Sequence, residues 1–229
     1  MRLLLCLCMF LPVLTHAQPT GGEVLSNVQA VFDGIEDYTV SLDVTVDIER
    51  LKVPPMQATM YFKQPDKVHF ESEGFALLPK EGVGFNPSML TRRYMVADME
   101  VQEISGKTAY VLTLKPRDDK TQLRKAYLTV DPDHWTPSEL VAPLFDGRIM
   151  RASFRHRRVD GRWLPSELRV SLTSDDSSDV KAPNLLDEMA PMRRQQIPRK
   201  GIIHVRYSEY RINTGLSDEL FDRKLVQPK

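Results

Sequence analysis

The sequence predicts a mainly β protein in which about ten antiparallel strands form one curled sheet. Three observations support this fold class. Residues 38–49 alternate apolar and polar side chains, which is the period of a strand and not of a helix. Asp-Gly pairs at 146–147 and 160–161 separate further strand-like segments, as they do in β-hairpins. No repeat of fixed period and no heptad pattern is present, which favours one sheet over a repeat array.

The first 17 residues predict a cleaved secretory signal peptide. Arg2 gives a short positive start, residues 3–14 form an apolar run, and Ala17 ends a small-residue cleavage site. The run is shorter than the roughly 20 residues that a transmembrane helix needs, which disfavours a membrane anchor. Cys6 and Cys8 lie inside the run, so a lipidated cysteine is not expected and the mature chain keeps no thiol. We therefore expect residues 18–229 to form a single periplasmic domain.

The mature chain is expected to open with an amphipathic helix. Apolar residues recur at helical spacing over 24–32, and Asp33-Gly34 supplies the stop. Strands are predicted at 38–49, at 56–63 after Pro54-Pro55, and at 68–70 after a turn at 64–66. Residues 74–93 mix apolar side chains with glycine and proline, which predicts an apolar loop.

The second half of the chain is expected to be a meander of strands. They are predicted at 94–96, 100–104, 108–114, 123–130, 140–145, 148–159, 163–172 and 201–212. Residues 173–200 are rich in Ser, Asp, Pro and Arg and predict a long polar loop, with a short helix near 185–196. Residues 213–221 resemble a turn that docks onto the sheet.

Charge and motifs exclude several classes of function. The 31 basic and 31 acidic residues balance, which disfavours nucleic acid as a partner. Nucleotide, hydrolase and metal-site motifs are absent from the sequence, so no cofactor and no enzymatic activity are expected. Asp131, Asp133 and His134 are the one acid and base cluster that could be nominated for catalysis, but an Asp-Pro-Asp segment between strands is first of all a turn.

A basic stripe runs along residues 148–158, which contain five arginines around His156. Side chains at two-residue spacing share one face of a strand, so part of the stripe forms a row. Pairing with acids on neighbouring strands is the favoured interpretation, and contact with anionic lipid or an acidic partner is the alternative.

Several segments together resemble the LolA/LolB-like superfamily, which includes periplasmic lipoprotein carriers and outer-membrane lipoprotein-sorting proteins. They are the helix ending at Phe32-Asp33-Gly34, the strand 38–50, and residues 60–68, 130–137, 159–165 and 210–216. The resemblance covers most of the mature chain. It implies a half-open antiparallel β barrel whose concave apolar face, covered by the first helix and loops, binds acyl chains.

The resemblance implies a periplasmic carrier that binds acyl chains of lipoproteins or phospholipid for transfer toward the outer membrane. Handover proteins at the inner and outer membranes would then be its partners. The expected cavity wall comprises Val40, Leu42, Val44, Met60, Phe62 and Phe70, and the expected cover comprises Phe75, Leu77, Phe85, Met89 and Leu90. Methionine and phenylalanine beside glycine suit a surface that adapts to variable apolar ligands. The arginine that latches the lid in the named carrier cannot be assigned here by spacing.

A second hypothesis is a periplasmic sensor or regulatory domain that binds a protein partner through the same half barrel. A third is an enzyme acting on envelope lipid or glycan, for which Asp131, Asp133 and His134 are the available residues. Under the third hypothesis, exchanging Asp133 for Asn would abolish turnover. The sequence leaves the client, the oligomeric state and the role of the basic stripe open.

Overall fold

The computed structural model describes residues 18–48, 51–72, 87–117, 125–144, 148–174 and 201–222. The predicted signal peptide, residues 74–86 of the predicted apolar loop and residues 175–200 of the predicted polar loop lie outside these ranges. The short helix predicted near 185–196 falls in the last of these segments.

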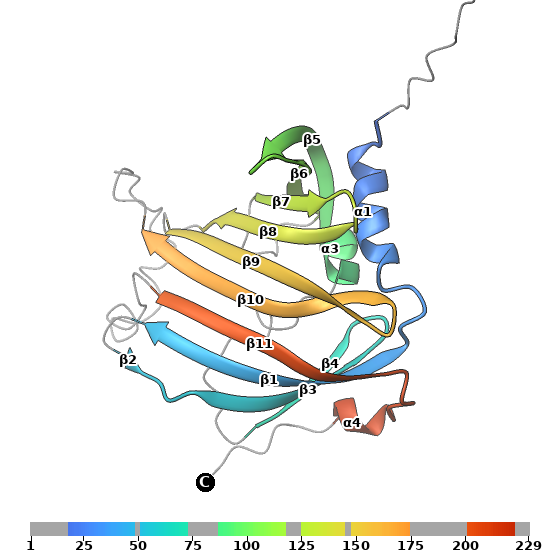
Figure 1. Ribbon diagram of the computed structural model, residues 1–229, viewed down its shortest axis with the longest axis vertical. Helices are drawn as coiled ribbons and strands as arrows, with labels where there is room; N and C mark the ends of the chain where they lie inside the picture. The colour runs from blue at the N-terminus through green and yellow to red at the C-terminus, as the bar shows by residue number, and fades with distance from the viewer. Residues whose placement is uncertain are drawn as a thin grey trace, which may run out of the picture.

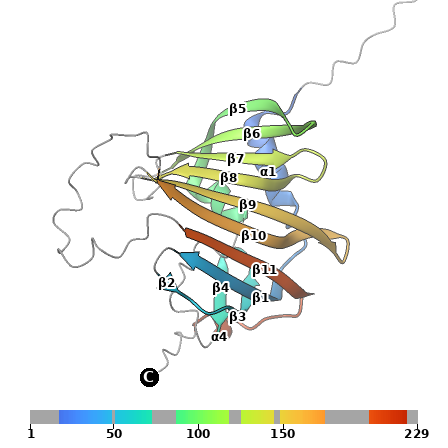
Figure 2. The ribbon, with the colours of Figure 1, turned by 60° about the vertical axis from the view of Figure 1, so that its left-hand side comes forward.

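One antiparallel sheet forms the body of the described chain (Figure 1). Its strands are β1 (Asp37–Ile48), β3 (Met56–Lys63), β4 (Lys67–Glu71), β5 (Tyr94–Ile104), β6 (Lys107–Pro116), β7 (Ala126–Asp131), β8 (Thr136–Pro143), β9 (Arg148–Val159), β10 (Arg162–Ser174) and β11 (Gly201–Ile212). Their order across the sheet is β4-β3-β1-β11-β10-β9-β8-β7-β6-β5, and β2 (Leu51–Lys52) pairs with β1 outside this path. Since β4 and β5 end the path, the curved sheet is not closed, which confirms the predicted half-open barrel (Figure 2).

The order of the strands in the sheet differs from their order in the chain. β1, β3 and β4 pair first, the chain passes to β5 at the other edge, and β5 to β11 follow as a meander. The last strand then returns to the first, with Leu42 opposite Tyr207 and Val44 opposite Val205. On its other side Leu42 lies opposite Ala58 of β3. β1 therefore joins the two parts of the sheet.

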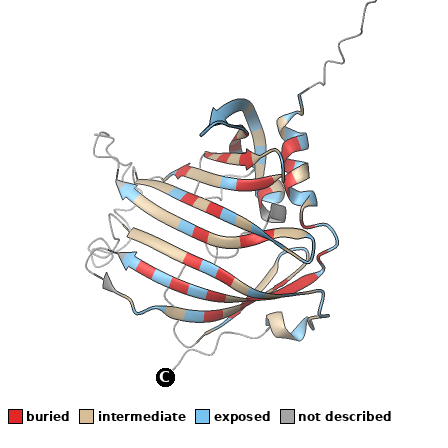
Figure 3. Ribbon diagram, in the orientation of Figure 1, coloured by how far each residue is buried: buried red, intermediate tan, exposed pale blue. Residues whose placement is uncertain are grey.

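Buried side chains alternate with exposed ones along the strands (Figure 3). Directly paired residues share one face of a sheet, and the pairs Leu42–Tyr207, Val205–Leu168 and Leu168–Phe154 place these buried residues together on one face, here called the inner face. Two clusters occupy it. The wall cluster lies mainly on β1, β3, β4, β9, β10 and β11, and the helix-covered cluster lies under α1 (Gly21–Ala30) and α3 (Pro87–Arg93) against β5 to β8.

Helix α1 begins with a capping box. The Thr20 hydroxyl accepts a hydrogen bond from the Glu23 N–H, and the Glu23 carboxylate accepts one from the Thr20 N–H at 2.7 Å. This arrangement satisfies two donors that a helix start would leave free. Val24, Leu25 and Val28 then face the sheet and are buried in the helix-covered cluster.

Two neighbouring glycines of α1 give a matched test of this packing. A Cβ on Gly21 would lie 2.5 Å from Val96 Cγ1 and 3.3 Å from Met99 Cβ, whereas a Cβ on Gly22 meets nothing within 4 Å. We expect Gly21→Ala to lower the free energy of unfolding by about 1–3 kcal/mol, because a stiff valine must move. Gly22→Ala should raise it by up to about 1 kcal/mol through helix propensity. Urea denaturation of both variants checks this, and equal stabilisation would contradict the close approach of α1 to β5.

The end of the chain docks onto the start of β1, as the sequence predicts for residues 213–221. The buried Asp37 carboxylate accepts hydrogen bonds from the N–H groups of Thr214, Gly215 and Leu216 and from the Thr214 hydroxyl, at 2.8–3.2 Å. The Asn213 side chain bridges Glu36 N–H and the Gly34 carbonyl at 2.8 Å each. These contacts form the Asp37 clamp, after which α4 (Glu219–Asp222) follows.

Ion pairs hold the docked end against the β3–β4 hairpin. Lys63 Nζ lies 2.7 Å and Lys67 Nζ 3.0 Å from the Asp218 carboxylate, and Lys63 also donates to the Leu216 carbonyl. Hydrogen bonds from both lysines lower the pKa of Asp218. These pairs are exposed and are screened by water, so the buried clamp is the firmer attachment.

Most elements agree with the predicted ones. The strand predicted at 140–145 is β8, which begins earlier, at Thr136, and β2 and α4 were not predicted. Two further differences have a clear local cause. Residues 87–93, predicted as part of a loop, form α3, because Pro87 suits the first turn of a helix and Leu90 can be buried against the sheet. Residues 94–104, predicted as two short strands, form the single strand β5 with a register shift between Val96 and Asp98. A bulge at this point offsets the alternation and explains the apparent break.

Candidate functional site

The six residues predicted to line a cavity lie together in the wall cluster. Val40, Leu42 and Val44 alternate along the inner face of β1, Met60 and Phe62 face them from β3, and Phe70 pairs with Met60 from β4. All six are 0–3% exposed. The structure thus brings them into one continuous apolar surface, and whether this surface binds a ligand stays a prediction.

Of the five predicted cover residues, the structure describes the side chain of Leu90 alone. Phe75, Leu77 and Phe85 lie outside the described residues, and Met89 belongs to α3 without a described side chain. Leu90 is 8% exposed and packs in the helix-covered cluster with Val24 and Leu112. The structure therefore does not unite Leu90 with the six wall residues.

Three strands add wall residues that the sequence did not nominate. Phe154, Leu164, Leu168, Val205 and Tyr207 belong to the wall cluster on β9, β10 and β11. The alternation of residues 203–207 was a signal for one of these strands. In β10, a register shift between Pro165 and Glu167 offsets the alternation and hides the pattern.

Tyrosines introduce polar atoms into the wall. Tyr38 stacks on Phe62 with ring centroids 4.9 Å apart and lies 5.6 Å from Tyr210. The Tyr210 hydroxyl donates to the Pro165 carbonyl at 2.8 Å. Burial raises the pKa of Tyr38, Tyr207 and Tyr210, so all three stay neutral hydrogen-bonding groups near neutral pH.

Helix α3 is tied to its surroundings by two arginines. Arg92 forms an ion pair with Asp66 in the β3–β4 turn. Arg117 Nε donates to the carbonyls of Thr91 and Tyr94 at 3.1 and 3.0 Å, which satisfies acceptors at the end of the helix. The helix therefore connects the two edges of the open sheet, since Asp66 precedes β4 and Tyr94 begins β5.

The acid and base cluster of the β7–β8 turn is built as a turn. Asp131 Oδ1 accepts from the Asp133 N–H at 2.9 Å, and Asp131 Oδ2 lies 3.3 Å from His134 Nδ1. The cluster borders a pocket of about 240 Å³ that Trp163 and His156 also line. Burial lowers the pKa of His156 to about 4, although the Asp131 charge partly opposes this. Both carboxylate oxygens of Asp131 thus make their contacts within the turn, in agreement with the favoured interpretation.

The basic stripe is divided by the structure. Arg151 pairs with Glu139 at 2.5 Å and Arg155 with Glu167 at 3.4 Å, both across neighbouring strands. The Arg157 guanidinium instead lies 5.9 Å from the centre of the Tyr210 ring. The pairs of Arg151 and Arg155 agree with the interpretation of a solvated face balanced by acids.

A broad depression of about 1160 Å³ lies along β1, β3 and β11. Its lining includes Ser41, Asp43, Thr45, Gln57 and Thr59, which alternate with the buried wall residues. Polar groups of this kind do not suit an acyl chain, because they would lose water without gaining hydrogen bonds.

Among the described residues, no helix is long and apolar enough to cross a membrane, and no group of three metal-binding side chains occurs.

Several solved structures are similar to this chain in fold. A LolA superfamily protein from Nitrosomonas europaea matches with a TM-score of 0.55 at 13% identity, over 89% of this chain and 98% of the other. The chain has a LolA-like fold. An outer membrane lipoprotein-sorting protein domain from Vibrio parahaemolyticus matches with a TM-score of 0.57 at 12% identity, over 87% and 95% of the two chains.

A third similar structure is a DUF1329 family protein from Desulfovibrio piger, with a TM-score of 0.56 at 16% identity over 87% and 94% of the two chains. No family model and no curated protein matches the sequence. At these identities, the likeness establishes the LolA-like fold alone, and function must be argued from the site.

Proposed function

We propose that the chain is a periplasmic carrier that holds acyl chains of lipoproteins or phospholipid against the wall cluster for transfer toward the outer membrane. The observation that carries the proposal is the continuous apolar inner face of an open LolA-like sheet, on which Val40, Leu42 and Val44 meet side chains from both neighbouring strands. The proposal includes export by the predicted signal peptide and binding without a covalent step.

The energetic need for such a surface is large. Each buried methylene is worth about 0.8 kcal/mol, so an acyl chain of roughly sixteen carbons costs on the order of 13 kcal/mol to expose to water. An apolar wall of valine, leucine, methionine and phenylalanine offers an equivalent environment. Because the six predicted wall residues are 0–3% exposed, binding requires that the acyl chain replace groups packed against them.

That burial is also the observation that favours the second candidate, a regulatory domain that binds a protein partner. A close-packed wall that does not open would act as an ordinary core. The half barrel would then serve as a scaffold, and recognition would take place on its rim or edges. Lipid binding therefore separates the two candidates.

A pair of isosteric variants tests the carrier proposal. Val40 in the wall cluster and Val130 in the helix-covered cluster are both 0% exposed strand residues. Val→Thr keeps the shape and adds a hydroxyl, so each variant should lose about 1–3 kcal/mol of stability. Only Val40→Thr should also weaken capture of a fluorescent sixteen-carbon fatty acid, by about tenfold, since an unpaired hydroxyl then faces the acyl chain.

Fluorescence titration measures the affinity, and native mass spectrometry of the detergent-free periplasmic protein identifies any lipid that copurifies. Urea denaturation provides the stability control for both variants. If Val40→Thr and Val130→Thr lose affinity for the fatty acid equally, the loss reflects lower stability of the fold, and the wall cluster is rejected as the binding site. An empty wild-type protein that also ignores the added fatty acid would reject the carrier and favour the partner-binding domain.

A further inference from the structure

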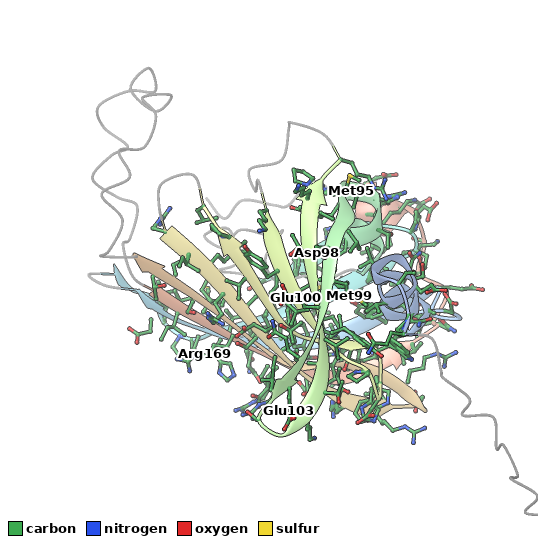
Figure 4. The ribbon with its side chains drawn as sticks, turned by 90° about the horizontal axis from the view of Figure 1, so that it is seen from above. Met95, Asp98, Met99, Glu100, Glu103 and Arg169 are labelled. Carbon is green, nitrogen blue, oxygen red and sulfur yellow. The ribbon has the colours of Figure 1, made fainter. Side chains whose placement is uncertain are left out.

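The strand β5 is an open edge of the sheet. It pairs with β6 on one side and ends the strand order on the other, over eleven residues from Tyr94 to Ile104. The opposite edge, β4, has five residues. An edge strand presents unpaired backbone N–H and carbonyl groups that another strand can use. Figure 4 shows β5 at the margin of the sheet, with Met95, Asp98, Glu100 and Glu103 labelled along it.

Exposed apolar side chains gather on this edge. Met95, Val101 and Ile104 are 48%, 41% and 43% exposed. Within the described ranges, these are the large apolar side chains with the most solvent contact, and all three lie on β5. Scattered single residues of this kind need no explanation, but their restriction to one strand indicates a surface that is covered in use.

The same strand carries charge of one sign. Asp98, Glu100 and Glu103 are exposed, and residues 94–104 contain no lysine or arginine. In the part of the chain that the structure describes, none of the three forms an ion pair. Asp98 Oδ1 accepts from the Met99 N–H, and Glu100 accepts from the Gln102 side chain at 2.8 Å. Their partners across the ladder, Thr113, Val111 and Thr108, carry no charge.

The carboxylates and the exposed apolar side chains of β5 together indicate which kind of partner can bind there. A second copy would bring three carboxylates against three more, and like charges on paired strands are destabilising. Anionic lipid would be repelled for the same reason. We propose that β5 is the docking edge for an extended segment of a partner protein that carries both basic and apolar side chains, and that the segment joins the sheet as one further strand.

Backbone hydrogen bonds supply the affinity in this mode of recognition, and side chains supply the specificity. Lysine or arginine of the partner lies beside Asp98 and Glu100 on one face of the sheet and beside Glu103 on the other, and its apolar side chains lie beside Met95, Val101 and Ile104. Charge alone also protects edges from aggregation, but protection does not account for three exposed apolar side chains on the same strand.

A charge exchange tests the docking edge in the chain from residue 18 onward. The probe is a fluorescein-labelled peptide in which Lys alternates with Val and Thr, and the comparison peptide has Glu in place of Lys. Fluorescence anisotropy should show the Lys peptide binding about tenfold or more tightly than the Glu peptide. The triple variant Asp98→Lys, Glu100→Lys, Glu103→Lys should reverse this preference.

The matched control changes three exposed acids elsewhere, Asp33→Lys, Asp47→Lys and Asp222→Lys, which gives the same net charge. It should keep the preference for the Lys peptide. Hydrogen exchange should show that the Lys peptide protects amides in residues 94–104, and circular dichroism should show that the variants are folded.

Four results would each overturn the proposal. They are loss of the preference in the control variant, absence of protection in β5, protection of residues 94–104 by phosphatidylglycerol vesicles in the absence of peptide, and a wild-type dimer in sedimentation that the β5 triple variant dissolves. The inference does not depend on acyl binding, so it stands or falls separately from the carrier proposal.

Discussion

Replacing Asp37 with alanine should lower the free energy of unfolding by about 3 kcal/mol. The carboxylate is 2% exposed and accepts four hydrogen bonds from residues 214–216. Hydrogen bonds to a charged group are worth about 1.5–3 kcal/mol each, and part of this is recovered when the freed N–H groups reach water. Urea denaturation at neutral pH measures the loss.

Two variants serve as controls for the Asp37 clamp. Asp37→Asn keeps one acceptor oxygen and should lose about half as much stability. Asp218→Ala removes an exposed carboxylate in the same docked segment and should have a far smaller effect, because exposed ion pairs contribute little. A loss for Asp37→Ala no larger than that for Asp218→Ala would show that the docked end does not stabilise the sheet.

The clamp also predicts a dependence on pH. Burial alone would raise the pKa of Asp37, but the hydrogen bonds from Thr214, Leu216 and Gly215 together outweigh it and lower the pKa below its ordinary value of 3.8. The contribution of Asp37 is therefore complete above about pH 5 and is lost as the pH falls through the folded-state pKa. His156 affects the stability at higher pH. Its pKa is about 4 in the folded chain and 6.5 ordinarily, so unfolding takes up a proton between these values and the stability decreases as the pH falls through this range. Asp37→Asn should flatten only the more acidic part of the stability curve.

Leu128→Ala should cost about 2–5 kcal/mol of stability. Leu128 is 0% exposed on β7 and lies between Leu112 on β6 and Leu140 on β8. Truncation removes apolar contacts and leaves a cavity that the flanking strands, held by their backbone hydrogen bonds, can fill only in part.

Thermal and urea unfolding of Leu128→Ala can be compared with those of Val101→Ala on β5, where the valine is 41% exposed. The exposed variant should change stability by less than about 0.5 kcal/mol. A loss below about 1 kcal/mol for Leu128→Ala would mean that the helix-covered cluster collapses around the cavity, and that α1 is not firmly seated on β5 to β8.

Local patterns predicted much of this fold, and long-range pairing explains what they missed. The alternation of residues 38–49 predicted β1 within one residue of its observed bounds, and Asp160-Gly161 marked a hairpin whose two turn residues both have positive φ. Nothing in a local pattern shows that β11 pairs with β1, because the partners Leu42 and Tyr207 are far apart in the sequence. Register shifts offset the alternation in β5, which concealed its length, and in β10, which concealed part of the wall.

For the candidate site too, local patterns predicted part of the arrangement and long-range contacts explain the rest. Val40, Leu42 and Val44 could be assigned to one face because a strand repeats every two residues, and Met60, Phe62 and Phe70 followed from two tight turns. The placement of Leu90 in the other cluster could not be predicted, because it depends on a short helix within a segment rich in glycine and proline. The Asp37 clamp joins residues near the two ends of the chain, and their separate motifs give no sign of contact.

The return of the last strand to the first has a consequence for how the molecule assembles. A chain that emerges from its N-terminus can pair β1 with β3 early, but the other margin of β1 stays bare until Gly201–Ile212 has emerged. Contacts between such distant segments make folding slow, since loop closure costs entropy before the pairing compensates for it. We therefore expect that, until β11 pairs with it, this margin of β1 is exposed to pairing with other chains.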